Sequence, residues 1–368
     1  MPIWIPEYLS KAKVEASNDQ TLYLDLPKNE QVSFLQVEVS AQGTSTPRTT
    51  TTLIDEIAKY EVLGEATKVL YSLEPEIAAY VDFISHGGRY PPMGFNYAPL
   101  ARETHEFIIP FGRFPFDPEY GLNTGDYPSG VQLQIPYTLD TSLFTTGTFR
   151  HSVVMWRPLT KLAFKGFIRS RTVKKETSGN AVETLEHKLP MTYPWRYVGV
   201  RVEDLDVNIS TGITGVKLNV DEGRLVLYDL LINELRDLDK KRYPEVNGYK
   251  ILGALSNTTM VKAHTDYPYP RAIVSSGVRA LMFKLYWAIG EQVGLNIYEE
   301  SGTVVTDSHA IDVHVSGPNP HKCLTLWDGR AEPFNAPAYT EAKVEYELAA
   351  YTTILHTFVQ EVVAGKLA

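Results

Sequence analysis

The chain has 368 residues, of which 43% are hydrophobic and 21% are charged, and its formal net charge is −9. This composition is typical of a folded protein with sizeable cores, and the length predicts about two domains. The acidic balance argues against specific nucleic-acid binding, and the single cysteine, Cys323, excludes an intrachain disulfide.

The first 15 residues are predicted to form an N-terminal arm. Pro2 and Pro6 oppose an early helix, and Trp4, Tyr8 and Leu9 make the segment apolar. Two interpretations stay open: the arm packs on its own domain, or it binds a neighbouring subunit or a membrane surface. The arm lacks the apolar core of a signal peptide, and no run reaches the ~18 apolar residues of a membrane span, so we expect synthesis in the cytoplasm.

The first half of the chain reads mainly as strands, because apolar and polar residues alternate over short segments bounded by Pro, Gly and Ser. We predict strands over residues 20–26, 32–40, 53–63, 67–73, 105–111, 131–139 and 148–156. Residues 75–85 read as a short helix, and residues 87–104 as a loop rich in Gly and Pro.

The second half repeats this pattern with a long addition. We predict strands over residues 163–173, 181–189, 196–203, 205–210, 214–220, 224–230, 250–264, 279–289, 293–298, 309–315, 322–327, 342–350 and 353–363. Residues 231–242 show the charge pattern of a helix that ends before Pro244. The second closing strand could also be a helix, but its resemblance to the end of the first half favours a strand. Residues 245–335 form a loop excursion that the first half lacks.

Three matches between the halves indicate an internal repeat. EATKVLYSL at residues 65–73 resembles EGRLVLYDL at residues 222–230, and we expect Leu70 and Val226 to lie in two equivalent cores. TLYLDLP from residue 21 resembles TLEHKLP from residue 184, and the same offset places Val37 on Val200. A looser match joins VQLQIPYTL, Phe149, Val153 and Val154 to AKVEYEL, Phe358, Val362 and Val363.

The repeat predicts an all-β protein of two tandem eight-stranded jelly-roll sandwiches, a double jelly roll, with a short helix in each. An eight-stranded jelly roll disposes of exposed strand edges by pairing two antiparallel sheets. The predicted boundaries are residues 1–15 for the arm, 16–158 for the first jelly roll and 159–368 for the second.

In these features the chain resembles the double jelly-roll major capsid proteins of icosahedral viruses, the lineage of adenovirus hexon and of internal-membrane phage and archaeal virus coats. The residues that carry the resemblance are KVLYSL and LVLYDL, each before a helix, the segment IIPFGRFPFDPEYGL with GVQLQIPYTL, and the closing AKVEYEL. The resemblance covers residues 16–365.

The resemblance implies a virion protein made in the host cytoplasm that forms a homotrimer, a pseudo-hexameric capsomer that tiles the shell. Its implied partners are neighbouring capsomers, minor capsid proteins and an internal membrane reached by the arm. Residues 245–335 would form an outward tower or a loop that locks the trimer. Two alternatives stay open: a carbohydrate-active or carbohydrate-binding protein, and a minor capsid or spike protein of related fold.

Catalytic, cofactor and metal sites are not predicted. Gly87, Gly88 and Arg89 lack the lysine and helix of a phosphate loop, and no HExxH, CxxC or GxSxG motif occurs. The strongest metal candidate is DSHAIDVHV, in which Asp307 and His309 share one strand face and Asp312 and His314 share the other, so four ligands do not converge. His264 and Asp266 form a second, weaker pair.

Two further clusters have an ordinary structural interpretation beside a functional one. The aromatic residues between Phe111 and Tyr127 could stack on sugars, but packing in a core or a subunit interface is the favoured interpretation. The basic residues Lys165, Arg169, Arg171, Lys174 and Lys175 could contact nucleic acid, lipid or an acidic neighbour, and a solvated strand face is the favoured interpretation.

Overall fold

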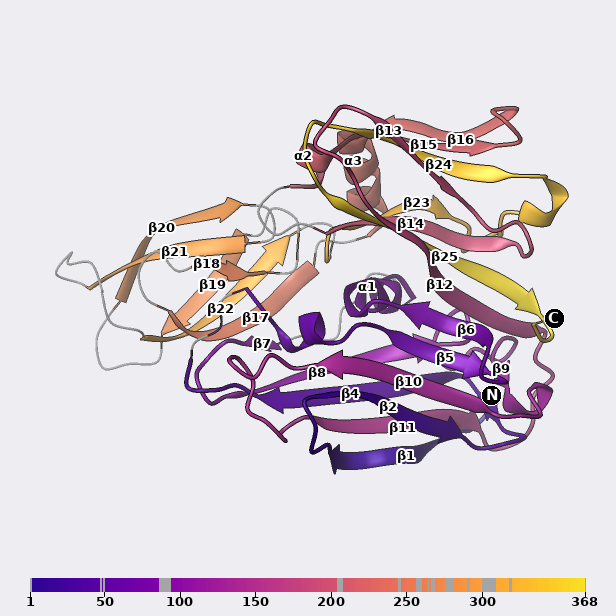
Figure 1. Ribbon diagram of the computed structural model, residues 1–368, viewed down its shortest axis with the longest axis horizontal. Coiled ribbons are helices and arrows are strands. Elements are labelled where there is room, and N and C mark those ends of the chain that lie inside the picture. The colour runs from indigo at the N-terminus through magenta and orange to yellow at the C-terminus, as the bar shows by residue number, and fades with distance from the viewer. Residues whose placement is uncertain are drawn as a thin grey trace.

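The protein consists of two stacked β-sandwiches, with a further group of strands projecting to one side (left in Figure 1). The computed structural model describes residues 2–46, 48, 50–85, 94–203, 208–243, 246–255, 260–263, 265, 269–275, 281–289, 292–299, 309–317 and 320–367. Within these residues, no helix is long and apolar enough to cross a bilayer.

The first sandwich contains two layers of four strands. One layer has the order β1-β11-β4-β8 and consists of β1 (Trp4–Val14), β11 (Arg150–Pro158), β4 (Phe34–Gln42) and β8 (Arg102–Pro110). The other has the order β2-β10-β5-β6 and consists of β2 (Asp19–Leu26), β10 (Val131–Thr138), β5 (Tyr60–Gly64) and β6 (Lys68–Leu73). Every second residue points inward, so that Val37, Val62 and Leu133 are fully buried in the core between the layers.

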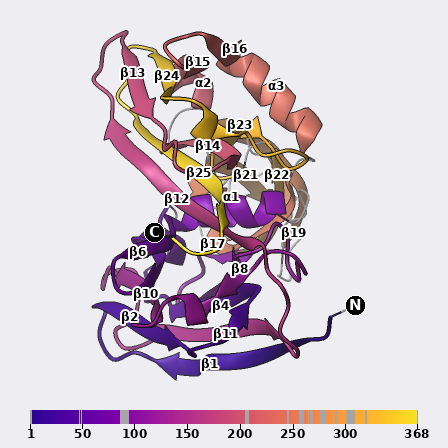
Figure 2. The same cartoon turned by 90° about the vertical axis from the view of Figure 1, so that its right-hand side faces the viewer.

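Short elements close the ends of this sandwich. They are the strands β3 (Gln31–Val32), β7 (Gly94–Asn96) and β9 (Leu122–Asn123), the 3-10 turns η1 (Leu53–Glu56) and η2 (Thr124–Asp126), and the helix α1 (Pro75–Ser85). Helix α1 follows β6 directly and lies between the two sandwiches in both views (Figures 1 and 2).

The second sandwich repeats the first, strand for strand. The layer β12-β25-β14-β23 consists of β12 (Gly166–Thr177), β25 (Ile354–Ala364), β14 (Trp195–Glu203) and β23 (Cys323–Asp328). The layer β13-β24-β15-β16 consists of β13 (Thr184–Lys188), β24 (Ala342–Leu348), β15 (Ile213–Val220) and β16 (Leu225–Leu231). Its helices are α2 (Ile209–Gly212) and α3 (Ile232–Arg242), with the 3-10 turn η3 (Ala336–Ala338). The expected double jelly roll with one short helix after each repeated strand is confirmed.

The two sandwiches share a continuous sheet. The edge strand β6 of the first pairs in parallel with the edge strand β12 of the second, through Tyr71 with Ser170 and Ser72 with Arg171. The layers β2-β10-β5-β6 and β12-β25-β14-β23 therefore form one eight-stranded sheet.

The projecting strands that follow α3 are β17 (Val246–Leu255), β18 (Met260–Lys262), β19 (Tyr269–Ser275), β20 (Leu281–Ile289), β21 (Gln292–Glu299) and β22 (His309–Gly317). They form the sheets β19-β22-β17-β7 and β18-β21-β20, in which β7 is the one strand that comes from the first half of the chain. These strands lie within the expected excursion, while β23 returns the chain to the second sandwich.

Several local expectations are confirmed or corrected. Of the two interpretations of the N-terminal arm, packing on its own domain is confirmed: residues 4–14 form β1, the edge strand of the first sandwich, because their backbone pairs with β11. The strand expected over residues 53–63 begins only at Tyr60, since the Asp55 carboxylate accepts hydrogen bonds from the backbone and hydroxyl of Thr52 and fixes the turn η1. Of the strand expected over residues 205–210, Ile209 and Ser210 instead begin α2, and residues 204–207 lie outside the described residues.

The strand patterns at the end of each half are confirmed, but their residue-by-residue match is not. Val153 pairs with Val37, and Thr357 pairs with Val200. Because Val37 and Val200 are equivalent, Val153 corresponds to Thr357 and not to Val362. The closing segment is the strand β25, so its helical alternative is wrong.

Candidate functional site

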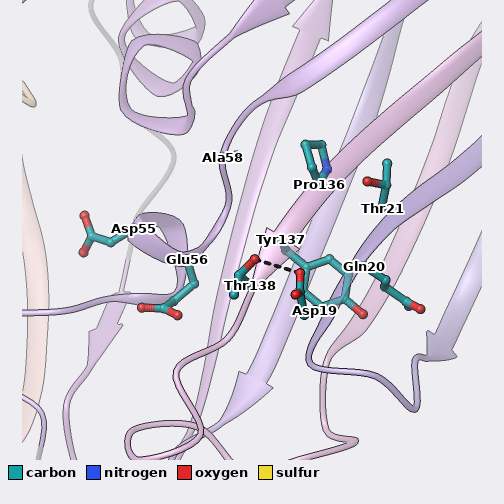
Figure 3. Close-up of a pocket in the computed structure, with 9 residues that line it drawn as sticks. All are labelled: Asp19, Gln20, Thr21, Asp55, Glu56, Ala58, Pro136, Tyr137 and Thr138. Carbon is teal, nitrogen blue, oxygen red and sulfur yellow. Dashed lines mark hydrogen bonds between the residues drawn. The ribbon is translucent and has the colours of Figure 1, made fainter.

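The described surface has several hollows lined mainly by polar residues. One lies beside β2, η1 and β10 and is lined by Asp19, Gln20, Thr21, Asp55, Glu56, Ala58, Pro136, Tyr137 and Thr138 (Figure 3). Asp19 accepts a hydrogen bond from the Thr138 hydroxyl at 3.0 Å, and Glu56 accepts one from the Asp140 amide at 2.6 Å. Both carboxylates therefore fix neighbouring backbone segments.

The aromatic ring of this hollow is not presented for sugar stacking. Tyr137 is only 2% exposed and stacks on Phe149, with 3.9 Å between ring centroids and 17° between the planes. Burial raises the pKa of Glu56, which is the ordinary response of a carboxyl group that loses water. The geometry has a structural explanation and does not favour glycoside chemistry here.

The metal candidates fall mostly outside the described part of the chain. His264, Asp266 and Asp307 are not described. His309, Asp312 and His314 belong to β22, an interior strand whose backbone pairs with both β17 and β19. Elsewhere among the described residues, no group of three or more His, Cys, Asp or Glu side chains is placed to hold a metal ion. The loop with Gly87, Gly88 and Arg89 also lies outside the described residues.

The aromatic residues of the 111–127 segment serve mainly in packing. Phe111 and Tyr127 belong to the core of the first sandwich. Phe116, 40% exposed, lies against Phe34 and Trp156, with centroids 5.0 and 5.3 Å away. Together with Trp4, at 5.7 Å from Phe116, they form an aromatic cluster on the outer side of the layer β1-β11-β4-β8. Packing, the favoured interpretation, accounts for the contacts of Phe111, Phe116 and Tyr127.

The junction between the sandwiches is an extensively buried contact within the chain. Every residue of α1 is buried, because the second sandwich covers the side of this helix that its own sandwich leaves open. Tyr80 lies 6.1 Å from the ring of Phe358, and its hydroxyl is 2.8 Å from that of Thr325. The core of the first sandwich thus continues into the outer face of β25, β14 and β23.

Buried ion pairs fix α1 and η1 to their neighbours. Arg201 on β14 donates to Glu76 on α1 at 2.9 Å across the junction, and Lys262 on the projecting strand β18 contacts Asp55 on η1 at 2.5 Å. Burying charge is costly unless an opposite charge and hydrogen bonds compensate, so these pairs fix the arrangement of these elements more than they add to its stability.

A buried histidine bridges the two sandwiches nearby. His356 lies 2.6 Å from Glu203 in the second sandwich and 3.5 Å from Glu74 in the first. Burial alone would raise the pKa of Glu74, but hydrogen bonds with His356 and Thr172 outweigh it and lower that pKa to about 2. The hydrogen bond with His356 is also the main reason why the pKa of Glu203 is lowered.

The basic strip lies on and just before β12 of the second sandwich, and its interpretation as a solvated face is wrong for Arg169, which is 8% exposed. Arg169 and Arg171 both bind the fully buried carboxylate of Glu361, at 2.6 and 3.1 Å. The other members form more exposed pairs: Lys165 with Glu119, Lys174 with Glu176 and Lys175 with Glu203. The sequence contained the arginines but no signal that a glutamate nearly 200 positions later would meet them.

Two further surfaces are exposed to solvent, although the equivalent surfaces of the other sandwich are covered at the junction. The first is the outer face of β4, β8 and β11, where Gln36, Glu38, Ser152 and Val154 are part-exposed and Glu106 is exposed. The second is the side of the second sandwich formed by β16 and α3, where Val226 is 41% and Leu231 is 60% exposed. The expectation that Val226 lies in a core is therefore wrong, whereas Leu70 is fully buried.

Solved structures with the same fold were found over nearly the whole chain. The crystal structure of the STIV MCP, a major capsid protein, matches 98% of this chain and 97% of its own length, with a TM-score of 0.56 and 10% identity. An atomic structure of Sulfolobus Turreted Icosahedral Virus matches 98% of this chain and 90% of its own, with a TM-score of 0.57 and 10% identity.

The major capsid protein P2 from bacteriophage PM2 gives a similar result. It matches 98% of this chain and 98% of its own length, with a TM-score of 0.52 and 7% identity. No family model matches the sequence, and no curated protein matches it. The double jelly roll of viral major capsid proteins is thus the fold of this chain.

Proposed function

We propose that this chain is the major capsid protein of an icosahedral virus and that it acts by self-assembly, without an active site. The observation that carries the proposal is the match of both sandwiches, in order and almost end to end, to major capsid proteins from two different viruses. A chance likeness of one sandwich would leave the other half unmatched.

The assembly unit in this proposal is a homotrimer with a pseudo-hexameric outline. Three chains supply six similar sandwiches, and a ring of six nearly equal parts tiles a shell. The projecting strands β17–β22 form a tower or a locking loop of the capsomer. The chain is made in the host cytoplasm and resides in the virion, where its partners are neighbouring capsomers, minor capsid proteins and an internal membrane near the N-terminal strand.

The interior of the chain supports a structural role. The junction between the sandwiches combines the fully buried helix α1 with the buried ion pair of Glu76 with Arg201, which makes each chain a rigid block. Rigid, preformed surfaces suit repeated contacts between identical copies, because little conformational entropy is lost when they meet.

Light scattering of the purified chain is the first test. A mass of three chains supports the proposal, and negative-stain images should then show particles with a hexagonal outline. A monomer that cleaves or retains a polysaccharide would overturn it in favour of a carbohydrate-active protein. Copy number in purified particles then separates a major coat protein from a minor capsid or spike protein.

A further inference from the structure

Each surface that takes part in the contact between the two sandwiches of one chain has an equivalent surface in the other sandwich. Within the chain, the outer face of β14, β23 and β25 covers α1 and β6. The equivalent outer face in the first sandwich belongs to β4, β8 and β11, and the equivalents of α1 and β6 in the second are α3 and β16. Within one chain, the outer face of β4, β8 and β11 and the side formed by α3 and β16 both stay uncovered.

Strand registers make the equivalence exact at the level of single residues. Val37 and Val200 are equivalent, so Glu38 takes the place of Arg201. Both sheets also carry a bulge at the same point of their edge strand, between Tyr8 and Ser10 in β1 and between Thr172 and Lys174 in β12. Such irregularities are specific features of a sheet and support the same alignment.

The helices align in the same way. The repeat places Leu73 on Leu230, which puts Glu76 in the position of Asn233 and Glu74 in the position of Leu231. Within the chain, Arg201 meets Glu76 and His356 meets Glu74. The corresponding pairs are Glu38 with Asn233 and Ser152 with Leu231.

We propose that the outer face of β4, β8 and β11 in one chain covers the α3 and β16 side of a second copy, and that it does so in the register of the junction inside the chain. This inference rests on the trimeric assembly proposed above and specifies its interface. Each chain has one surface of each kind, so the contact is head-to-tail, and such contacts close into a ring when the rotation between copies permits.

Exposure of apolar groups on both surfaces supports this pairing. Leu231 and Val226 are exposed on one side, while Val154 is part-exposed and Phe116 is 40% exposed on the other. Exposed apolar groups that gather on one face of a soluble protein typically mark an interaction site. In the first sandwich, the counterpart of Leu231 is Glu74, which contacts His356 and Thr172 of the second sandwich.

The contact between chains is more polar than the junction that it copies. Tyr80 and Phe83 of α1 are replaced by Asp237 and Lys240 of α3, and the sheet carries Glu38 and Glu106 where the junction has Arg201 and Cys323. A surface that stays in water until assembly must remain soluble, and non-obligate interfaces are accordingly more polar than cores.

Side chains, not a shared backbone ladder, carry the proposed contact. In the register above, Pro6 of β1 takes the position of Ser170, which pairs with Tyr71 inside the chain. Proline has no amide hydrogen to donate, and an exposed proline is a common means of blocking strand addition at an edge. We therefore expect β16 and the neighbour's β1 to lie close without forming the parallel pairing of β6 and β12.

Cross-linking with a short bismaleimide tests the register directly. Glu38→Cys and Asn233→Cys are introduced together, and Ser152→Cys with Leu231→Cys provides a second pair. β4 lies in the lower sandwich and α3 in the upper part of the upper sandwich in both views (Figures 1 and 2). A short link between them therefore joins two copies. Denaturing gels should show covalent dimers and trimers for both pairs.

Two controls set the background. The wild-type chain has only Cys323, which is fully buried, and should give no link. Glu38→Cys with Lys188→Cys moves the second thiol to β13, the opposite edge of the sheet from β16, and should link far less. Trimers by light scattering without a link in either designed pair would overturn this interface and leave the proposed function standing. A wild-type chain that stays monomeric would overturn both.

Discussion

Asp82 and Asp239 perform the same task in the two sandwiches. Asp82, on α1, accepts a hydrogen bond from the amide of Ile108 in β8 at 3.2 Å, and Asp239, on α3, accepts one from the amide of Thr325 in β23 at 2.8 Å. In each sandwich the helix is thus fastened to the strand that follows it in the fold. A polar contact conserved between the halves supports their equivalence independently of their apolar pattern.

Leu70 in β6 and Val226 in β16 should respond in opposite ways to substitution by aspartate. Leu70→Asp places an unpaired carboxylate in a fully buried core and should destabilise folding by more than about 4 kcal/mol, so that no soluble folded chain is recovered. Val226→Asp lies on a surface and should leave the unfolding midpoint of the monomer nearly unchanged while reducing trimer formation. Denaturant unfolding and light scattering measure the two effects. A misfolded Val226→Asp chain would contradict the observed exposure.

Asp239 should make the second sandwich less stable in alkaline solution. Burial raises its pKa to about 7, against the opposing hydrogen bond from Thr325 and the charge of Arg242. A carboxyl group with a raised pKa contributes stability below its ordinary pKa of 3.8, and this contribution is lost as the pH rises through 7.

Asp239→Asn removes this dependence and keeps an oxygen for the Thr325 amide. We expect the variant to gain stability relative to wild type between pH 5 and pH 8, by on the order of 1 kcal/mol for each pKa unit that is removed. Urea unfolding at both pH values measures this gain, and a constant difference between the two proteins would contradict the role of the proton.

The Glu361 carboxylate should be essential for the stability of the second sandwich, where it joins β25 to β12. Glu361→Gln leaves Arg169, which is 10% exposed, and Arg171 without their shared anion. Removing one partner of a buried ion pair costs about 3 kcal/mol or more, because a buried charge is left uncompensated. Glu119→Gln, which removes the exposed partner of Lys165, is the matched control and should change the unfolding midpoint little. Equal midpoints for both variants would show that the second sandwich does not depend on this pair.

The contacts of His356 with Glu74 and Glu203 should make the free energy of unfolding fall in acid solution. The pKa values of Glu74 and Glu203 are lowered, so the stability that these groups supply is complete above their ordinary pKa of 4.5 and is lost as the pH falls toward 2. His356→Gln should lower stability at neutral pH by about 1–3 kcal/mol and flatten the loss below pH 4.5. Unfolding curves from pH 2 to 7 test this, and parallel curves for both proteins would contradict it.

The sequence predicted the architecture well because the repeat carries more information than any single strand. Helices α1 and α3 and the strand pairs before them were predicted from the matched segments around Leu70 and Val226. The error about Val226 lies in its pairing with Leu70, because the match aligns Leu70 with Leu227 and Val226 with Val69. Leu70 and Val226 therefore lie on opposite faces of equivalent strands, and only the face that carries Leu70 packs into a sandwich core.

Two polar contacts inside the sandwiches could not be predicted from the sequence. The basic strip around Arg169 looks like a solvated strand in the sequence, because its partner Glu361 is distant along the chain. The 3-10 turn at Leu53–Glu56 escaped prediction because the strict alternation of Val216, Leu218 and Val220 in the repeat favoured a strand there, although Leu53, Ile54 and Ile57 also fit a helical face. The capping contacts of Thr52 and Asp55 decided the outcome. In both cases, a side-chain hydrogen bond outweighed the apolar pattern.

The parallel pairing of β6 with β12 has a mechanical consequence for a shell built from such chains. A ring of three chains would have six seams, of which three run through a single polypeptide and are stitched by this backbone ladder. The other three rest on side chains alone. Swelling or uncoating would then separate each capsomer at the three seams between chains and release intact single subunits.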